Sequence, residues 1–114
     1  MALQLNITLP NGAAGNYLRV VNVEWNRLAS VCVFQLALYL SEAQADAAPR
    51  YPLGIVAQVR VDREKFEQYL SNQAIAAASH NIIAQLYAIT RAEPGCITLL
   101  GSLRDIDLST ATDV

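Results

Sequence analysis

The sequence predicts an α+β fold: an antiparallel β-sheet of about four strands, arranged as an N-terminal meander, followed by a short and a long helix packed on it. Two observations predict this class. Apolar and polar residues alternate through much of residues 3–61, which is the period of strands. Residues 62–91 instead repeat apolar side chains every three or four positions, as amphipathic helices do. We expect one domain over residues 1–104 and an acidic C-terminal tail over 105–114, flexible unless a partner orders it.

The first strand is expected at the N-terminus, where every second residue is apolar and the residues between are polar. The apolar positions are Leu3, Leu5, Ile7 and Leu9. The next residues, Pro10, Asn11 and Gly12, are turn formers, so the chain is expected to reverse within residues 10–16.

A second strand is predicted from Tyr17 to about Asn26. Its apolar positions change phase partway along, first at Leu18 and Val20, and then at Val21, Val23 and Trp25. A phase change of this kind indicates either a β-bulge or a strand covered on both faces. We favour the bulge.

The third strand, Val31 to Leu40, has apolar residues on both faces, interrupted only by Gln35, which predicts a central strand. The alanine-rich, charged segment 41–50 is expected to form one helical turn or a loop. A fourth strand, from Ile55 to Val61, alternates again, with Gln58 and Arg60 on a face exposed to water.

Two helices are predicted next. Asp62 is expected to cap a short helix that ends near Leu70, because its carboxylate can accept hydrogen bonds from amides of the first turn. A long helix is expected from about Asn72 to Arg91, and a charge on its core stripe, as in Ile82→Asp, should unfold the domain. That stripe comprises Ile75, Ala78, Ile82, Ile83, Leu86 and Ile89. A final short strand is expected over residues 96–100.

Composition limits the classes of function. The net charge is −2, and no row of basic residues could neutralise nucleic-acid phosphates, so no nucleic-acid partner is expected. No apolar run is long enough for a membrane span, and no signal peptide is evident. Charged residues make up only 16% of the chain, against about 25% in typical soluble domains. Because residues 1–18, 28–41 and 68–90 carry no formal charge apart from a titratable histidine, we expect some of these stretches to contact a partner.

Candidate catalytic residues are few. His80 is the only histidine, and a neighbouring Ser79 would point away from it on a helix, so no hydrolytic triad is expected. The acidic residues Asp105, Asp107 and Asp113 do not have the spacing of a calcium loop. Cys32 and Cys96 show no metal-binding or redox motif. We therefore expect no enzymatic activity, no cofactor and no metal.

The best positive signal is an uncharged second face of the long helix. Small alanines allow close approach of another backbone, and amides can hydrogen-bond across a junction, so this face is predicted to be an interface with another subunit. The alternative is an alanine-rich face exposed to solvent, which helix propensity alone would permit. The predicted interface residues are Ala77, His80, Asn81, Ala84 and Ala88.

Several short motifs are spread along the chain: Asn6-Ile7-Thr8-x-Pro10-x-Gly12 before Tyr17, Leu38-Tyr39-Leu40-Ser41, Tyr51-Pro52-Leu53, Phe66 to Leu70, Leu86-Tyr87 and Ala111-Thr112-Asp113-Val114. In these motifs the chain resembles the small structural proteins encoded among the tail and tail-fibre genes of tailed bacteriophages. The motifs span most of the chain, and each is degenerate. The resemblance implies a non-enzymatic virion component of the distal tail, baseplate or fibre attachment region, present in several copies. The connection after the last helix, residues 90–110, is longer than in such proteins.

Two functional hypotheses follow. In the first, the chain is a bacteriophage tail subunit or a fibre assembly chaperone, made in the host cytoplasm and located in the virion tail. Its partners would be other tail or fibre proteins and further copies of itself. In the second, it is a small-ligand-binding or regulatory module that dimerises through its sheet, with a pocket near Trp25 and Tyr51, whose aromatic rings suit such sites.

Overall fold

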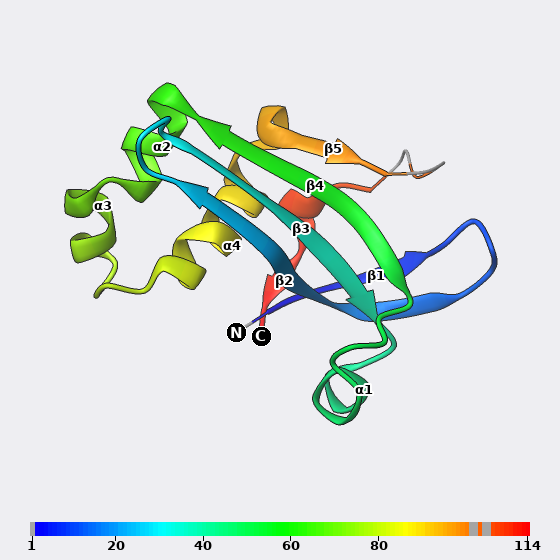
Figure 1. Cartoon of the computed structure of the whole chain (residues 1–114). Coiled ribbons are helices and arrows are strands. Elements are labelled where there is room, and N and C mark those ends of the chain that lie inside the picture. Colours follow the sequence, from blue (N-terminus) through cyan, green and yellow to red (C-terminus); the bar gives the residue numbers. More distant parts are fainter. Residues whose placement is uncertain (1, 101–102, 104–105) are drawn as a thin grey trace.

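The computed structural model describes residues 2–100, 103 and 106–114 of the 114-residue chain. In this part the chain forms one antiparallel sheet of six strands, in the order β5-β4-β3-β2-β1-β6, with helices packed against it (Figure 1). The α+β class and the antiparallel meander agree with the sequence prediction. The strands are β1 (Leu3–Thr8), β2 (Ala14–Asn26), β3 (Val31–Tyr39), β4 (Gly54–Asp62), β5 (Ile97–Leu99) and β6 (Thr112–Asp113). The helices are α1 (Glu42–Ala47), α2 (Arg63–Leu70), α3 (Asn72–Ala77) and α4 (Ile82–Ala92), with short 3-10 turns η1 (Pro94–Cys96) and η2 (Leu108–Thr110).

The sheet has two more strands than the four or so expected, because short segments pair with its edges. The strand expected at residues 96–100 is present as β5, which pairs with β4. The last residues of the chain form β6, which pairs with the start of β1. The two-residue β6 was not predicted, because so short a strand carries too little periodicity to be recognised in sequence.

The bulge predicted in the second strand is confirmed. The pairing of β2 with β3 shifts register between Val21 and Glu24. Asn22 lies in this interval with a positive φ of 51°, and its side-chain amide donates to the Gln35 side chain. The extra residue places Val21 and Glu24 on the same face of the sheet, although three positions separate them.

The main core lies between one face of the sheet and helices α2 and α4, which lie behind the strands in Figure 1. Strand β3 supplies Cys32, Phe34, Leu36 and Leu38 to this core, all fully buried. No helix in the described part of the chain is long and apolar enough to cross a membrane.

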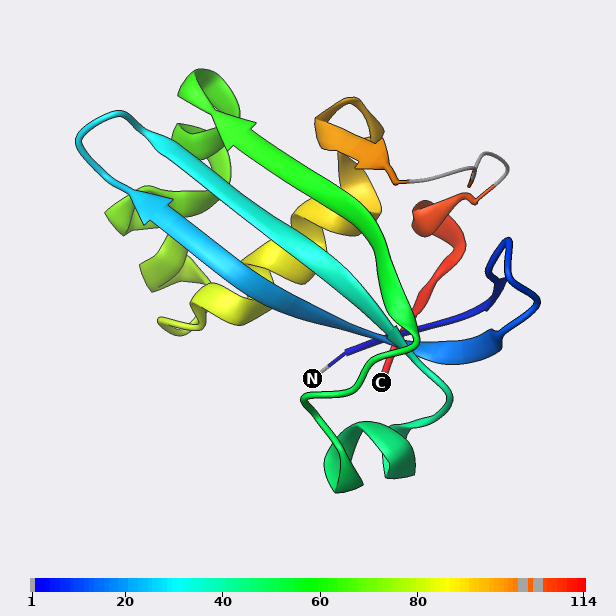
Figure 2. The same ribbon diagram turned by 45° about the vertical axis from the view of Figure 1, so that its right-hand side comes forward.

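Helix α1 covers one end of the opposite face, and its Ala45 is buried there against Tyr17, Ala37 and Tyr39. The side chain of Ser41 caps α1 by accepting a hydrogen bond from the Gln44 amide. Figure 2, turned by 45°, shows α1 standing apart from the other helices. The second face of the sheet is therefore covered only in part.

The prediction of one long helix from about Asn72 to Arg91 was wrong. The chain forms α3, then a turn in which Ser79 and His80 have positive φ values of 57° and 60°, and then α4. The side chain of Asn81 starts α4 by accepting a hydrogen bond from the Ala84 amide. Two consecutive residues in the left-handed region cannot continue a right-handed helix.

The break changes which residues are buried. Leu86 and Ile89 are fully buried, as predicted, but Ile82 and Ile83 are 38% and 46% exposed. The predicted core stripe was wrong at these two positions. The expectation that Ile82→Asp unfolds the domain therefore no longer holds.

Two further expectations differ from the structure. Asp62 does precede α2, but its side chain makes no capping hydrogen bond and instead pairs with Arg60 at 3.2 Å. The described part of the C-terminal tail, residues 106–114, packs with the domain. Leu108 and Ala111 are buried in the main core, and β6 joins the sheet.

Candidate interaction surfaces

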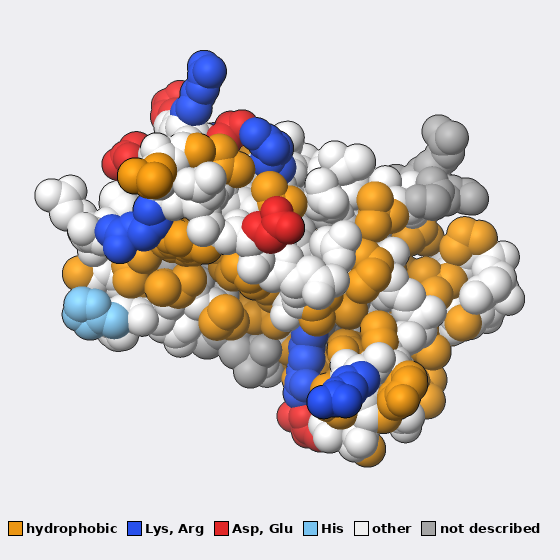
Figure 3. Space-filling model, viewed as in Figure 1, with side chains coloured by type: hydrophobic (Ala, Val, Ile, Leu, Met, Phe, Trp, Pro, Cys, Tyr) orange, Lys and Arg blue, Asp and Glu red, His pale blue; other side chains and the backbone are white. Residues whose placement is uncertain are grey.

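The uncovered part of the sheet is the first candidate surface. Val31, Val33 and Gln35 point away from the main core, because successive strand residues alternate in direction and Cys32 and Phe34 are buried in it. All three are half-buried, and helix α1 covers only the other end of β3. Figure 3 views this side, where hydrophobic side chains lie among a few scattered charged ones.

We call this surface the open face. Strand pairing assigns its members, since residues paired across neighbouring strands share a face. They are Val21, Glu24 and Asn26 of β2, Val31, Val33 and Gln35 of β3, and Gln58, Arg60 and Asp62 of β4. The solvent face of an antiparallel sheet normally carries polar residues, so two valines in its central strand are unusual.

The charges of the open face lie at its sides. One row across the sheet is Glu24, Val33, Arg60, with an acid on β2 and a base on β4. The Arg60 Nε lies 3.2 Å from the Asp62 carboxylate on the same strand. Glu24 belongs to none of the ion pairs in the described part of the chain. The face therefore has an apolar centre and one unpaired acid.

The second candidate surface is a groove between α4 and the C-terminal strand, with a cavity volume of about 780 Å³. Its apolar lining lies mainly on one side of α4, and a polar end is formed where Arg91 Nη1 lies 2.8 Å from Asp113. The Arg91 Nε is buried and has no hydrogen-bond partner among the described residues. The α4 groove is lined by Ala84, Tyr87, Ala88, Arg91, Ala92, Ser109, Asp113 and Val114.

The five predicted interface residues do not form one continuous face. Ala84 and Ala88 line the α4 groove. Ala77 is the exposed last residue of α3, and His80 is exposed in the turn that separates the two helices. Asn81 is exposed, with its side chain used to cap α4. Helical spacing alone could not show this separation, because it assumes that the helix continues.

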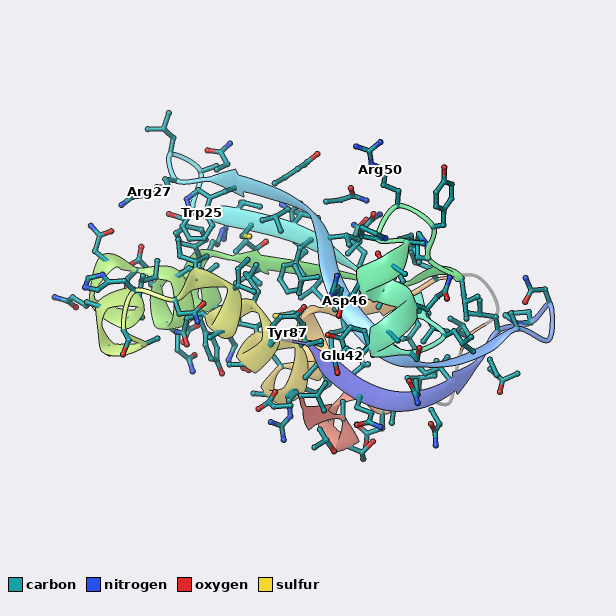
Figure 4. The ribbon with its side chains drawn as sticks, turned by 90° about the horizontal axis from the view of Figure 1, so that it is seen from below. Trp25, Arg27, Glu42, Asp46, Arg50 and Tyr87 are labelled. Atoms are coloured by element: carbon teal, nitrogen blue, oxygen red, sulfur yellow. The ribbon has the colours of Figure 1, made fainter. Side chains whose placement is uncertain are left out.

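The structure does not bring Trp25 and Tyr51 together. Trp25 packs on Phe66, with ring centroids 5.4 Å apart, and Figure 4 shows it toward the end of the strands that is remote from α1. Tyr51 lies in the loop after α1 and is 77% exposed. Neither residue lines the α4 groove. The positions of Trp25 and Tyr51 therefore do not support one ligand pocket near both residues.

Several titratable side chains in the described part of the chain have shifted pKa values. Burial raises the pKa of the Cys32 thiol to about 11 and also raises the pKa of the Tyr87 hydroxyl. Asp107 accepts from the hydroxyl and amide of Ser109, which lowers the pKa of its carboxyl. Asp105 lies outside the described residues. Over residues 2–100, 103 and 106–114, no three His, Cys, Asp or Glu side chains are grouped so that they could hold a metal ion.

Comparison with known proteins adds no family to these observations. Protein-family models, curated proteins and solved structures gave no significant match to the chain.

Proposed function

We propose that this protein is a non-enzymatic assembly subunit of a bacteriophage tail, in the baseplate, at the fibre attachment site or associated with the fibre. The observation that carries the proposal is the open face, where Val31 and Val33 of the central strand have no covering element in the described chain. Burying such a face against another protein stabilises the contact by removing apolar area from water. A subunit of a larger assembly needs surfaces that it can bury against other proteins in this way.

Two features of the sequence support this setting. The charged fraction of 16% is low for a small soluble monomer, and residues 28–41, which include all of β3, carry no formal charge. The sequence motifs resemble small tail and tail-fibre proteins. A multi-copy structural component buries uncharged surface in its contacts, so composition and resemblance favour the same class.

The test is deletion of the gene from the phage that carries it, followed by electron microscopy and protein analysis of the purified particles. We expect particles without the gene to lack a tail or fibre part, and the wild-type chain supplied in trans to restore that part. Val33→Glu should fail to restore it, whereas Glu67→Gln, an exposed change on α2, should succeed. Complete particles in the absence of the gene would overturn the proposal.

A second candidate function is small-ligand binding, and the α4 groove is the observation that favours it. Its volume of about 780 Å³ falls within the range of about 300–1,000 Å³ typical of ligand pockets. The lining combines alanines and Tyr87 with a polar end at Arg91 and Asp113. This combination suits a compact, mostly apolar molecule with one polar group.

A thermal-shift screen of small metabolites separates the two functions. A ligand that fills the groove should raise the melting temperature of the wild-type chain by mass action. Ala88→Trp, which fills the groove with a side chain, should abolish that shift. Val33→Glu should leave it unchanged, because Val33 is on the opposite face of the sheet from α4.

A further inference from the structure

We propose that the open face binds the open face of a second copy of this chain, so that the protein forms a two-fold symmetric dimer in which Glu24 of each copy pairs with Arg60 of the other. This inference rests on the proposed function. It specifies one contact in the assembly, which is made between two copies of this chain. The distribution of charge and apolar area on the open face indicates that its partner is a second copy of the chain.

The row across the sheet determines the arrangement. Val33 pairs with Glu24 of β2 on one side and with Arg60 of β4 on the other. A two-fold axis that lies between two open faces and runs along β3 places β3 over β3 and β2 over β4 of the second copy. The axis keeps each residue at its height along the strand. Glu24 therefore lies opposite Arg60 of the second copy, and the same pair forms twice.

The neighbouring row is compatible with the same axis. Val31 pairs with Asn26 on β2 and with Asp62 on β4. The axis places the Asn26 amide, a hydrogen-bond donor, opposite the Asp62 carboxylate of the second copy, which is an acceptor. Both rows are thus complementary to their own two-fold copies.

The centre of the face supplies the apolar part of the contact. Val31 and Val33 of the two copies meet along the axis, and Gln35 lies over Gln35 of the second copy. Side-chain amides carry both donors and acceptors, so two facing glutamines can satisfy each other. The contact has an apolar middle with charges at its sides, which is the usual anatomy of a protein interface.

The test uses two single charge reversals and their mixture, with solution mass measured by light scattering. In a dimer of Glu24→Arg alone, positive charges oppose each other at both sides of the contact. In a dimer of Arg60→Glu alone, negative charges do so. Each variant is expected to dimerise at least tenfold more weakly than the wild-type chain. Mixed in equal amounts, the two should form a 1:1 dimer, because the two introduced side chains then carry opposite charges and face each other, while the two native side chains pair at the other side.

Two controls keep the result interpretable. Glu67→Arg makes the same charge change on α2, outside the open face, and should dimerise like the wild-type chain. Far-ultraviolet circular dichroism should show that each variant is folded, which matters for Arg60→Glu because it also removes the ion pair with Asp62. The double variant Glu24→Arg, Arg60→Glu should recover the dimer.

A wild-type chain that stays monomeric, or single variants that dimerise normally, would overturn the proposed dimer. So would a mixture that forms no dimer from two folded variants. These results leave the gene-deletion test untouched, because an assembly subunit could use the open face for a different protein. Loss of the dimer inference and loss of the proposed function are therefore seen in separate experiments.

Discussion

The hydroxyl of Tyr87 on α4 accepts a hydrogen bond of 2.9 Å from the backbone amide of Val20 on β2. Strand β1 pairs with β2 only as far as Leu18, so the Val20 amide lies just beyond the point where that ladder ends. At this position the Tyr87 hydroxyl therefore accepts the hydrogen bond that a neighbouring strand would otherwise accept. The bond also fixes α4 against the sheet, and the same residue lines the α4 groove.

Removing this hydroxyl should destabilise the protein. Tyr87→Phe keeps the ring but leaves the part-buried Val20 amide without its partner, at an expected cost of about 1–3 kcal/mol. Urea unfolding followed by circular dichroism measures the change. Tyr51→Phe is the control, because that side chain is 77% exposed and its replacement should have little effect. Equal stability of the two variants would contradict the role of the Val20 contact.

Stability should fall as the pH rises above about 9. The pKa of the buried Cys32 thiol rises from 9.0 to about 11 on folding, because burial disfavours the thiolate. Above pH 9 the unfolded chain has lost this proton while the folded chain keeps it, so this contribution is complete below pH 9 and is lost as pH rises through about 11. The loss attributable to Cys32 should be about 1 kcal/mol at pH 10. Cys32→Ala should reduce the slope of stability against pH between 8 and 10, and an unchanged slope would argue against a buried thiol.

The break between α3 and α4 predicts the sign of a glycine substitution. His80 has a φ of 60°, where glycine is favoured over other residues, so His80→Gly should leave stability unchanged or raise it by up to about 1 kcal/mol. In a continuous helix the same change would remove a better helix former and destabilise. Ala88→Gly, inside α4, should cost about 0.5–1 kcal/mol and serves as the comparison. Thermal unfolding of both variants decides between the two arrangements.

Burial distinguishes two isoleucines of the same helix. Ile89→Ala should cost about 2–5 kcal/mol, because the side chain is fully buried in the main core. Ile82→Ala should cost less than about 1 kcal/mol, and Ile82→Asp should remain folded, since 38% of Ile82 is exposed. Circular dichroism of Ile82→Asp gives the direct answer. If Ile82→Asp were unfolded, the result would favour a continuous helix with Ile82 in the core.

These contrasts show which parts of the fold sequence reasoning could reach. Alternation located the four long strands, and a phase change located the bulge in β2 beside Asn22, because side-chain period follows directly from strand geometry. The helix break was missed because residues 75–89 keep a helical period through it. Helix α3 is separated from α4 by the left-handed backbone conformation of Ser79 and His80, which non-glycine residues rarely adopt.

The surfaces were harder to predict than the elements. Ala84 and Ala88 were identified from helical spacing, but the other wall of the α4 groove comes from the C-terminal strand, and Asp113 lies 22 positions beyond Arg91. The open face had one clear signal in the sequence, the apolar residues on both sides of the third strand. What sequence could not show was that α1 covers only one end of that face.

The most direct test of the dimer through the open face is the mass of the wild-type chain in solution, measured by size-exclusion chromatography with light scattering over a concentration series. Our account predicts a species of twice the mass of the 114-residue chain that persists at high salt, because the centre of the contact is apolar. Val33→Glu should convert it to a folded monomer. A wild-type chain that is monomeric at every concentration would contradict the dimer through the open face.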